Sequence, residues 1–151
     1  MKTLATNKKA FYNYEILETN EAGIVLSGPE VKASRQGLVN LAGSYISLDK
    51  NNEVWLNNAS IAPYPPAQSF QERSGYDPLR NRKLLLSKKE INSLIGKIKI
   101  KGLTLIPLKI YLKNNLIKAE IGLARGKKKW EKKEKIKERE MKKRIKREFQ
   151  L

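Results

Sequence analysis

The chain of 151 residues contains neither cysteine nor histidine. Without cysteine it can form no disulfide and no thiolate metal site. Without histidine it lacks the commonest general base and the commonest metal ligand of proteins. We therefore expect no metal site and no catalytic residue.

Long apolar runs are also missing from the sequence. The N-terminal stretch "MKTLATNKKAFYNYEILE" has no apolar region of the kind that a signal peptide requires, and no other stretch approaches the length of a membrane span. These absences predict a cytoplasmic protein that does not span a membrane.

Negative charge is scarce, because 32 Lys and Arg residues face only 15 Asp and Glu residues, which leaves a net charge of +17. From Arg125 onward the net charge is +9, and the preceding residues carry +8. An excess of this size favours a polyanionic partner, either nucleic acid or an anionic membrane surface. Both parts of the chain are expected to contribute to its binding.

The sequence divides into three expected segments. Residues 1–10 are polar and are predicted to be flexible, residues 11–124 to form one folded domain, and residues 125–151 to form a basic tail. Within the domain, prolines lack the amide hydrogen that a central strand needs, so we interpret Ala62 to Pro78 as a long surface loop.

Short β-branched and apolar runs that alternate with turn residues predict antiparallel strands. Six such strands and two short helices favour a mostly β fold, a small antiparallel barrel of the oligonucleotide-binding type. The expected elements are a hairpin of Tyr12–Thr19 and Ala22–Ser27, a hairpin around Asn51 and Asn52, a hairpin around Asn114 and Asn115, a helix from Pro29 to Gln36, and a helix after Ser87 that ends near Gly102.

The closing segment "RGKKKWEKKEKIKEREMKKRIKREFQL" allows several interpretations. Glu-to-Lys or Glu-to-Arg pairs four positions apart support a helix, but each contributes only about 0.2–0.5 kcal/mol. We expect a tail that is disordered when free and helical when bound, while a plain solvated tail remains the alternative. Trp130 lies among lysines, a setting that favours stacking on a nucleobase.

Several motifs follow one another in a familiar order: "NKKAFYNYEI", "GPEVKASRQG", "YDPLRNRKLLLSKKEINSL", "KIYLKNNLIKAEIGLARGKKKW" and "IKERE". Together they resemble the SmpB family of bacterial SsrA-binding proteins over nearly the whole chain. The resemblance implies a barrel that holds the tRNA-like domain of transfer-messenger RNA. It also implies a tail that enters the empty decoding centre of the small ribosomal subunit.

The function implied by this resemblance is that of a non-enzymatic adaptor for ribosome rescue by trans-translation. Elongation factor Tu with GTP is an implied partner through the charged RNA. One alternative is a general ribosome-associated or single-strand RNA-binding protein of the same fold class. An RNA-processing enzyme is a second alternative, although the acids outside the tail are scattered along the sequence.

The resemblance assigns RNA contacts in the body to Asn7, Glu30, Leu85 and Lys118. On physical grounds Lys118 points outward from a strand and can neutralise a phosphate. Glu30 is equally well explained as a first-turn helix acid. Leu85, within "LLL", is more simply a core leucine.

In the tail, the resemblance implies roles at the ribosomal decoding site. Trp130 stands where some relatives carry histidine, and the change keeps a flat aromatic face but removes a titratable group. The tail positions that match the family are Gly126, Lys127, Lys128, Trp130, Ile136, Lys137 and Arg139.

Overall fold

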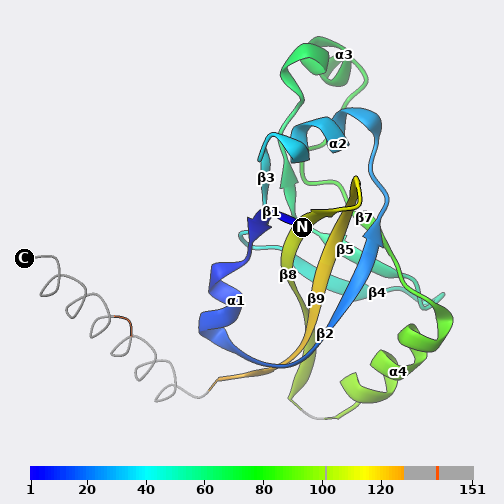
Figure 1. Ribbon diagram of the computed structural model, residues 1–151. Helices are drawn as coiled ribbons and strands as arrows, with labels where there is room; N and C mark the ends of the chain where they lie inside the picture. Colours follow the sequence, from blue (N-terminus) through cyan, green and yellow to red (C-terminus); the bar gives the residue numbers. More distant parts are fainter. Residues whose placement is uncertain (101, 128–138, 140–151) are drawn as a thin grey trace, which may run out of the picture.

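The computed structural model describes residues 1–100, 102–127 and 139. Within these residues a seven-stranded antiparallel sheet has the order β1-β8-β9-β2-β7-β5-β4, and β3 pairs with β6 (Figure 1). The strands are β1 (Lys2–Thr6), β2 (Tyr14–Ile24), β3 (Val39–Asn40), β4 (Tyr45–Leu48), β5 (Val54–Asn57), β6 (Ser60–Ile61), β7 (Arg82–Leu85), β8 (Leu103–Lys113) and β9 (Leu116–Gly126). The helices are α1 (Lys8–Asn13), α2 (Gly28–Arg35), α3 (Gln68–Arg73) and α4 (Lys88–Ile98), with a 3-10 turn at Pro65–Ala67.

The prediction of a mostly β chain with short helices in a barrel-like body is confirmed. The sheet curls so that β4 comes close to β8, although the hydrogen-bonded order of the described strands ends at β1 and β4 without closing. The expected state of the tail, and its positions Lys128, Trp130, Ile136 and Lys137, lie outside the described residues.

Two hairpins form as predicted. Asn114 and Asn115 connect β8 to β9 with φ angles of 50° and 62°, and the strands pair directly on either side, at Lys113 and Leu116. Positive φ at both central residues is the geometry of a tight hairpin turn, and asparagine tolerates it better than other side chains do. The hairpin of β4 and β5 also forms, with Asn52 at a φ of 60°.

The predicted hairpin within residues 12–27 is wrong, because β2 is one continuous strand. Asn20 and Glu21, expected in a turn, instead pair with Ile121 and Glu120 of β9. The ladder with β9 runs from Tyr14 to Gly23 and supplies partners for the backbone groups on that edge of β2, which a local turn would interrupt. β2 thereby lies between β9 and β7, near the middle of the sheet.

The N-terminal residues are also more ordered than the sequence predicts. Lys2–Thr6 form β1, which pairs with the outer edge of β8, and the Asn7 amide donates to the Leu108 carbonyl at 2.8 Å. An uncovered edge on β8 would expose a row of unpaired backbone groups. Pairing with β1 supplies the partners, so the expected flexibility of residues 1–10 is not found.

A β-bulge at Leu108 divides the apolar residues of β8 between two clusters. The register shifts between Pro107 and Lys109, so Ile110 faces the main core while Leu108 and Ile106 pack with Ala10 under α1. Such a bulge changes the face on which side chains lie, and alternation counted across it fails.

Both predicted helices are present. Ser27 caps α2 and Gly37 follows its end with a φ of 79°. Ser87 caps α4, whose Leu94 is buried in the core. The predicted loop from Ala62 to Pro78 is only partly a loop, since it contains the 3-10 turn and α3, which project at the top of Figure 1.

The β8–β9 turn generates a stability prediction. Replacing Asn115 by valine places a β-branched residue at a φ of 62° and should lower the free energy of unfolding by about 1–3 kcal/mol. Replacement by glycine, which adopts this φ without strain, should cost far less. Urea denaturation of the two variants checks this, and equal losses would contradict the strain argument.

Candidate nucleic-acid interface

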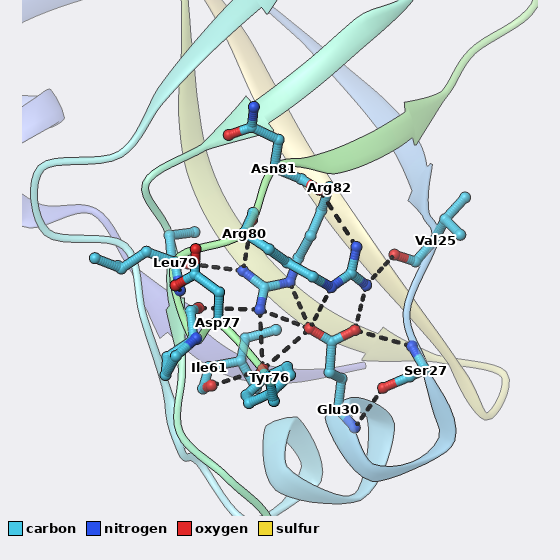
Figure 2. Close-up of polar contacts among 12 residues, drawn as sticks. Val25, Ser27, Glu30, Ile61, Tyr76, Asp77, Leu79, Arg80, Asn81 and Arg82 are labelled. Carbon is cyan, nitrogen blue, oxygen red and sulfur yellow. Dashed lines mark hydrogen bonds and ion pairs between the residues drawn. The ribbon is translucent and has the colours of Figure 1, made fainter. Parts of the chain in front are cut away.

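Glu30 lies in the first turn of α2, and its side chain is completely buried. The backbone amide of Ser27 donates to its carboxylate at 2.9 Å, which completes a capping box at the start of the helix. The guanidinium of Arg82 donates to the same carboxylate at 2.8 and 2.6 Å. Arg80 binds it from the opposite side (Figure 2).

Arg82 is as deeply buried as Glu30. Besides the carboxylate, it donates to the carbonyl oxygens of Ala59 at 2.7 Å and Pro78 at 3.0 Å. The Tyr76 hydroxyl accepts from Arg82 at 3.0 Å and lies 2.8 Å from the Ile61 carbonyl oxygen. Because charged groups without partners are costly in the interior, this shell of contacts is what allows the pair to be buried.

The network fixes the charge of its members. Burial alone would raise the pKa of Glu30, but hydrogen bonds from Arg80, the Ser27 amide and Arg82 outweigh it and lower the pKa to about 2. Burial and the adjacent Glu30 charge raise the pKa of Tyr76 to about 12. At neutral pH the carboxylate is ionised, the phenol is neutral, and the two arginines leave a net charge of +1.

That excess charge reaches the surface only at Arg80. Its side chain is 37% exposed, while those of Glu30 and Arg82 are 0% exposed. Glu30 is therefore closed to a direct RNA contact. What the sequence did not reveal is that its partners lie fifty residues away, although the spacing of Ser27 and Glu30 does match a capping box.

Lys118 and Leu85, which are 33 positions apart in sequence, lie in one row across the sheet. Lys118 of β9 pairs with Gly23 of β2, and Gly23 pairs with Leu85 of β7 on its other side. Residues directly opposite one another in antiparallel strands point to the same face. The structure thus brings these two predicted site residues to one surface, here termed the outer face, with a glycine between them.

Leu85 is 52% exposed, whereas the preceding Leu84 is 2% exposed and belongs to the core. The assignment of Leu85 to the core is therefore wrong, because the alternation of the strand turns it outward. Gly23 leaves the space between Lys118 and Leu85 unfilled. A side chain at this position would crowd Leu85, because its Cβ would lie only 3.2 Å from the Leu85 Cβ.

The strands of the outer face also carry polar and aromatic side chains that were not predicted from the sequence. Trp55 of β5 pairs with Lys83 of β7, and its indole donates to Asp49 at 2.9 Å. Tyr111 of β8, opposite Lys118, donates to Glu21, and burial together with this contact raises the pKa of its phenol. The alternation of inward and outward side chains within β5 and β8 is the sequence signal that could have assigned Trp55 and Tyr111 to this face.

Asn7 is a structural connector between β1 and α1 in this structure. Its side-chain amide donates to the Pro107 carbonyl at 2.8 Å, which ties the chain to β8. Asn7 follows the edge strand β1 and lies outside the row of Lys118 and Leu85, which crosses β9, β2 and β7.

The start of the tail is attached to α1. Gly126 ends β9, the Lys127 amide donates to the Asn13 carbonyl at 2.9 Å, and the Lys127 ammonium donates to the Phe11 carbonyl at 3.1 Å. Arg139 lies over the Tyr12 ring, 5.7 Å from its centre. These tail positions therefore lie at the α1 end of the molecule.

In the described part of the chain, acidic side chains form no group of three that could hold a metal ion. No helix among these residues is long and apolar enough to cross a membrane.

The Glu30 network predicts a defined dependence on pH. The pKa falls from 4.5 to about 2 on folding, so the stabilisation is complete above pH 4.5 and is lost as the pH falls toward 2. It amounts to about 3 kcal/mol. Glu30→Gln should lower the free energy of unfolding by a similar amount at pH 7 and flatten its decline in acid.

Chemical denaturation at a series of pH values measures both effects. Glu15→Gln is the matched control, because Glu15 pairs with Arg125 at the surface, where an ion pair contributes less than about 1 kcal/mol. An unchanged acid slope in Glu30→Gln would show that the buried carboxylate is not the group that titrates.

Comparison with known proteins gives one consistent result. The family model described as "SmpB protein" matches residues 4–151. The SsrA-binding protein of Sulfurihydrogenibium sp. (strain YO3AOP1) is 55% identical over 148 residues, 98% of this chain and 94% of that protein. The SsrA-binding protein of Persephonella marina (strain DSM 14350 / EX-H1) is 54% identical over 99% of this chain and 95% of its own length.

A solved structure agrees with these relatives. A chain in the structure described as "tmRNA-SmpB: a journey to the center of the bacterial ribosome" aligns with a TM-score of 0.63 at 48% identity. The alignment covers 82% of this chain and 84% of that one. The chain therefore belongs to the SmpB protein family.

Proposed function

We propose that the protein binds SsrA RNA, the transfer-messenger RNA, and acts as a non-enzymatic adaptor for ribosome rescue by trans-translation. The observation that carries this proposal is family membership over residues 4–151, which includes both the sheet and the tail. Relatives that match over the same length are SsrA-binding proteins, and the solved neighbour is described together with this RNA and the ribosome.

The outer face supplies the chemistry for holding the RNA. Lys118 neutralises a phosphate, and the exposed Leu85 packs against a base or ribose. Gly23 between them leaves room for the backbone of the nucleic acid to approach the sheet. These two residues are the direct contacts that we propose on the outer face, and Asn7 contributes by fixing β1 and α1 to β8.

Glu30 acts on the RNA through Arg80 in this proposal. The carboxylate holds the Arg80 guanidinium beside the Val25 carbonyl oxygen, 3.4 Å away, at the end of β2. Because Arg82 already neutralises Glu30, the charge of Arg80 remains available for a phosphate. Glu30 is thus a positioning residue and Arg80 the contact.

The tail serves the ribosome in the same proposal. Lys127 attaches its first residues to α1, so that the remainder starts from a fixed point on the body. Tail residues enter the decoding centre of the small subunit, while elongation factor Tu with GTP joins the complex through the charged RNA. The proposed tail positions are Gly126, Lys127, Lys128, Trp130, Ile136, Lys137 and Arg139, and the proposed compartment is the cytoplasm.

A truncation tests this division of labour. A chain that ends at Lys127 keeps the contacts of β9 and α1, so it should bind the tRNA-like domain with nearly unchanged affinity. It should no longer support peptide tagging on stalled ribosomes, because the tail is gone. Competition binding at physiological salt and a reconstituted tagging assay measure the two activities.

Ordinary tRNA and an unstructured single strand are the competitors for both chains. Preference for the tRNA-like domain is the expected result. Equal binding of all three RNAs would support a general RNA-binding protein instead. A large loss of RNA affinity on truncation would refute the assignment of the tail to the ribosome.

The role of Arg80 predicts a change in salt dependence. Arg80→Ala should weaken RNA binding and reduce the slope of log affinity against log salt by about 1, because one phosphate contact is lost. Lys99→Ala is the control, since Lys99 is an exposed cation at the end of α4. It should leave the slope nearly unchanged.

The double variant of Glu30→Gln and Arg80→Ala separates positioning from contact. If Glu30 acts through Arg80, the double variant should bind RNA no more weakly than Arg80→Ala alone. The double variant and Arg80→Ala are compared under conditions where circular dichroism shows that both are folded. A lower RNA affinity of the double variant would mean that Glu30 affects the RNA by another route.

A further inference from the structure

A cavity of about 410 Å³ opens at the edge of the outer face, where β5, β7 and α4 meet. The pairing of β5 with β7 ends at Val54 and Leu84. Beyond these residues the two segments separate, since the chain before β5 leads back to the turn of Asn51 and Asn52 while β7 leads to the N-cap of α4 at Ser87. The cavity occupies the gap that this separation creates.

The floor of the cavity is apolar. Val54 and Leu84 are 1% and 2% exposed, and Ile91 of α4 packs against the same core. Leu85, half-exposed, forms the lip shared with the outer face. A flat apolar group that enters from the outer face would therefore contact apolar side chains.

The rim is polar and carries positive charge. The side chains of Asn51, Asn52 and Asn92 line it, and none of these three side-chain amides has a hydrogen-bond partner among the described residues. Lys88 lines the same rim and likewise has no ion-pair partner in the described part of the chain. Lys83, also at the rim, is bound to Glu53 at 3.2 Å.

We propose that this cavity receives one unpaired nucleobase of the bound RNA, an inference that rests on the function proposed above. The floor and Leu85 match the faces of a base, and the three amides supply both donors and acceptors for its edge. Lys88 is placed to neutralise the adjoining phosphate. Paired bases are stacked inside a duplex, so only a base that is turned out of its stack fits the site.

The cavity adds to the outer face a type of contact that Lys118 and Arg80 cannot provide. Phosphate contacts position an RNA without distinguishing sequence or structure, whereas an unstacked base is available only where the RNA fold presents one. The site would therefore contribute to preference for a folded RNA that displays an unpaired base in the correct place.

Filling the cavity tests the proposal. Asn92→Trp places an indole at the rim from an exposed position of α4, so the core is left intact. Ser93→Trp is the matched control, because Ser93 is exposed on the same helix and does not line the cavity. The full-length chain carries each substitution, and equal thermal denaturation of the two variants verifies folding.

Two measurements are made with the tRNA-like domain of SsrA RNA. We expect Asn92→Trp to weaken binding about tenfold, the loss of roughly one stacked base, and Ser93→Trp to bind like the unsubstituted protein. In chemical probing with dimethyl sulfate and a carbodiimide, one unpaired base should be protected by the unsubstituted protein and by Ser93→Trp. The same base should react in the complex with Asn92→Trp.

Unchanged affinity and an unchanged protection pattern in Asn92→Trp would overturn the base site while leaving the proposed function standing. Failure of the unsubstituted protein to prefer the tRNA-like domain over tRNA and a single strand would instead overturn the proposed function and the base site with it. Equal losses in the two tryptophan variants would place the effect on the surface of α4 and also overturn the base site.

Discussion

The buried ion pair of Glu30 and Arg82 joins α2 to β7 in the interior of the molecule. Its carboxylate belongs to α2, its guanidinium to β7, and its outer contacts reach the carbonyl oxygens of Ala59 and Pro78. Neither charge is tolerable in the interior without the other. Together with the Arg80 contact and the pairing of β7 with β5, this ion pair fixes how α2, the segment that bears α3 and the first residues of β7 meet.

The same contact shapes the surface. One carboxylate shared by two arginines leaves a positive charge, and the burial of Arg82 places it at Arg80, beside the end of β2. Along the neighbouring strands, Gly23 separates Lys118 from Leu85 without rising above the sheet. A surface that carries the cations Lys118 and Arg80 attracts a polyanion, and the glycine between Lys118 and Leu85 lets the backbone of such a partner approach the sheet.

Features that depend on neighbouring residues could be predicted from the sequence, whereas contacts between residues far apart in the sequence could not. The turn at Asn114 and Asn115 consists of residues that tolerate positive φ, so its position could be predicted correctly. Asn20 carries a similar local signal, but pairing with β9 overrides it. Leu85 could be placed only once its strand register was known, and the burial of Glu30 depends on arginines fifty positions away.

The order of strands in the sheet also has a consequence for biosynthesis. β1 and β2 are made first, yet their partners β8 and β9 are separated from them by about a hundred residues, which is roughly 5–20 s of translation. During that interval the nascent chain lacks the two strands that complete its sheet. Native folding is therefore a late event in the synthesis of the chain, and a ribosome that halts before β9 carries a body that cannot yet assemble.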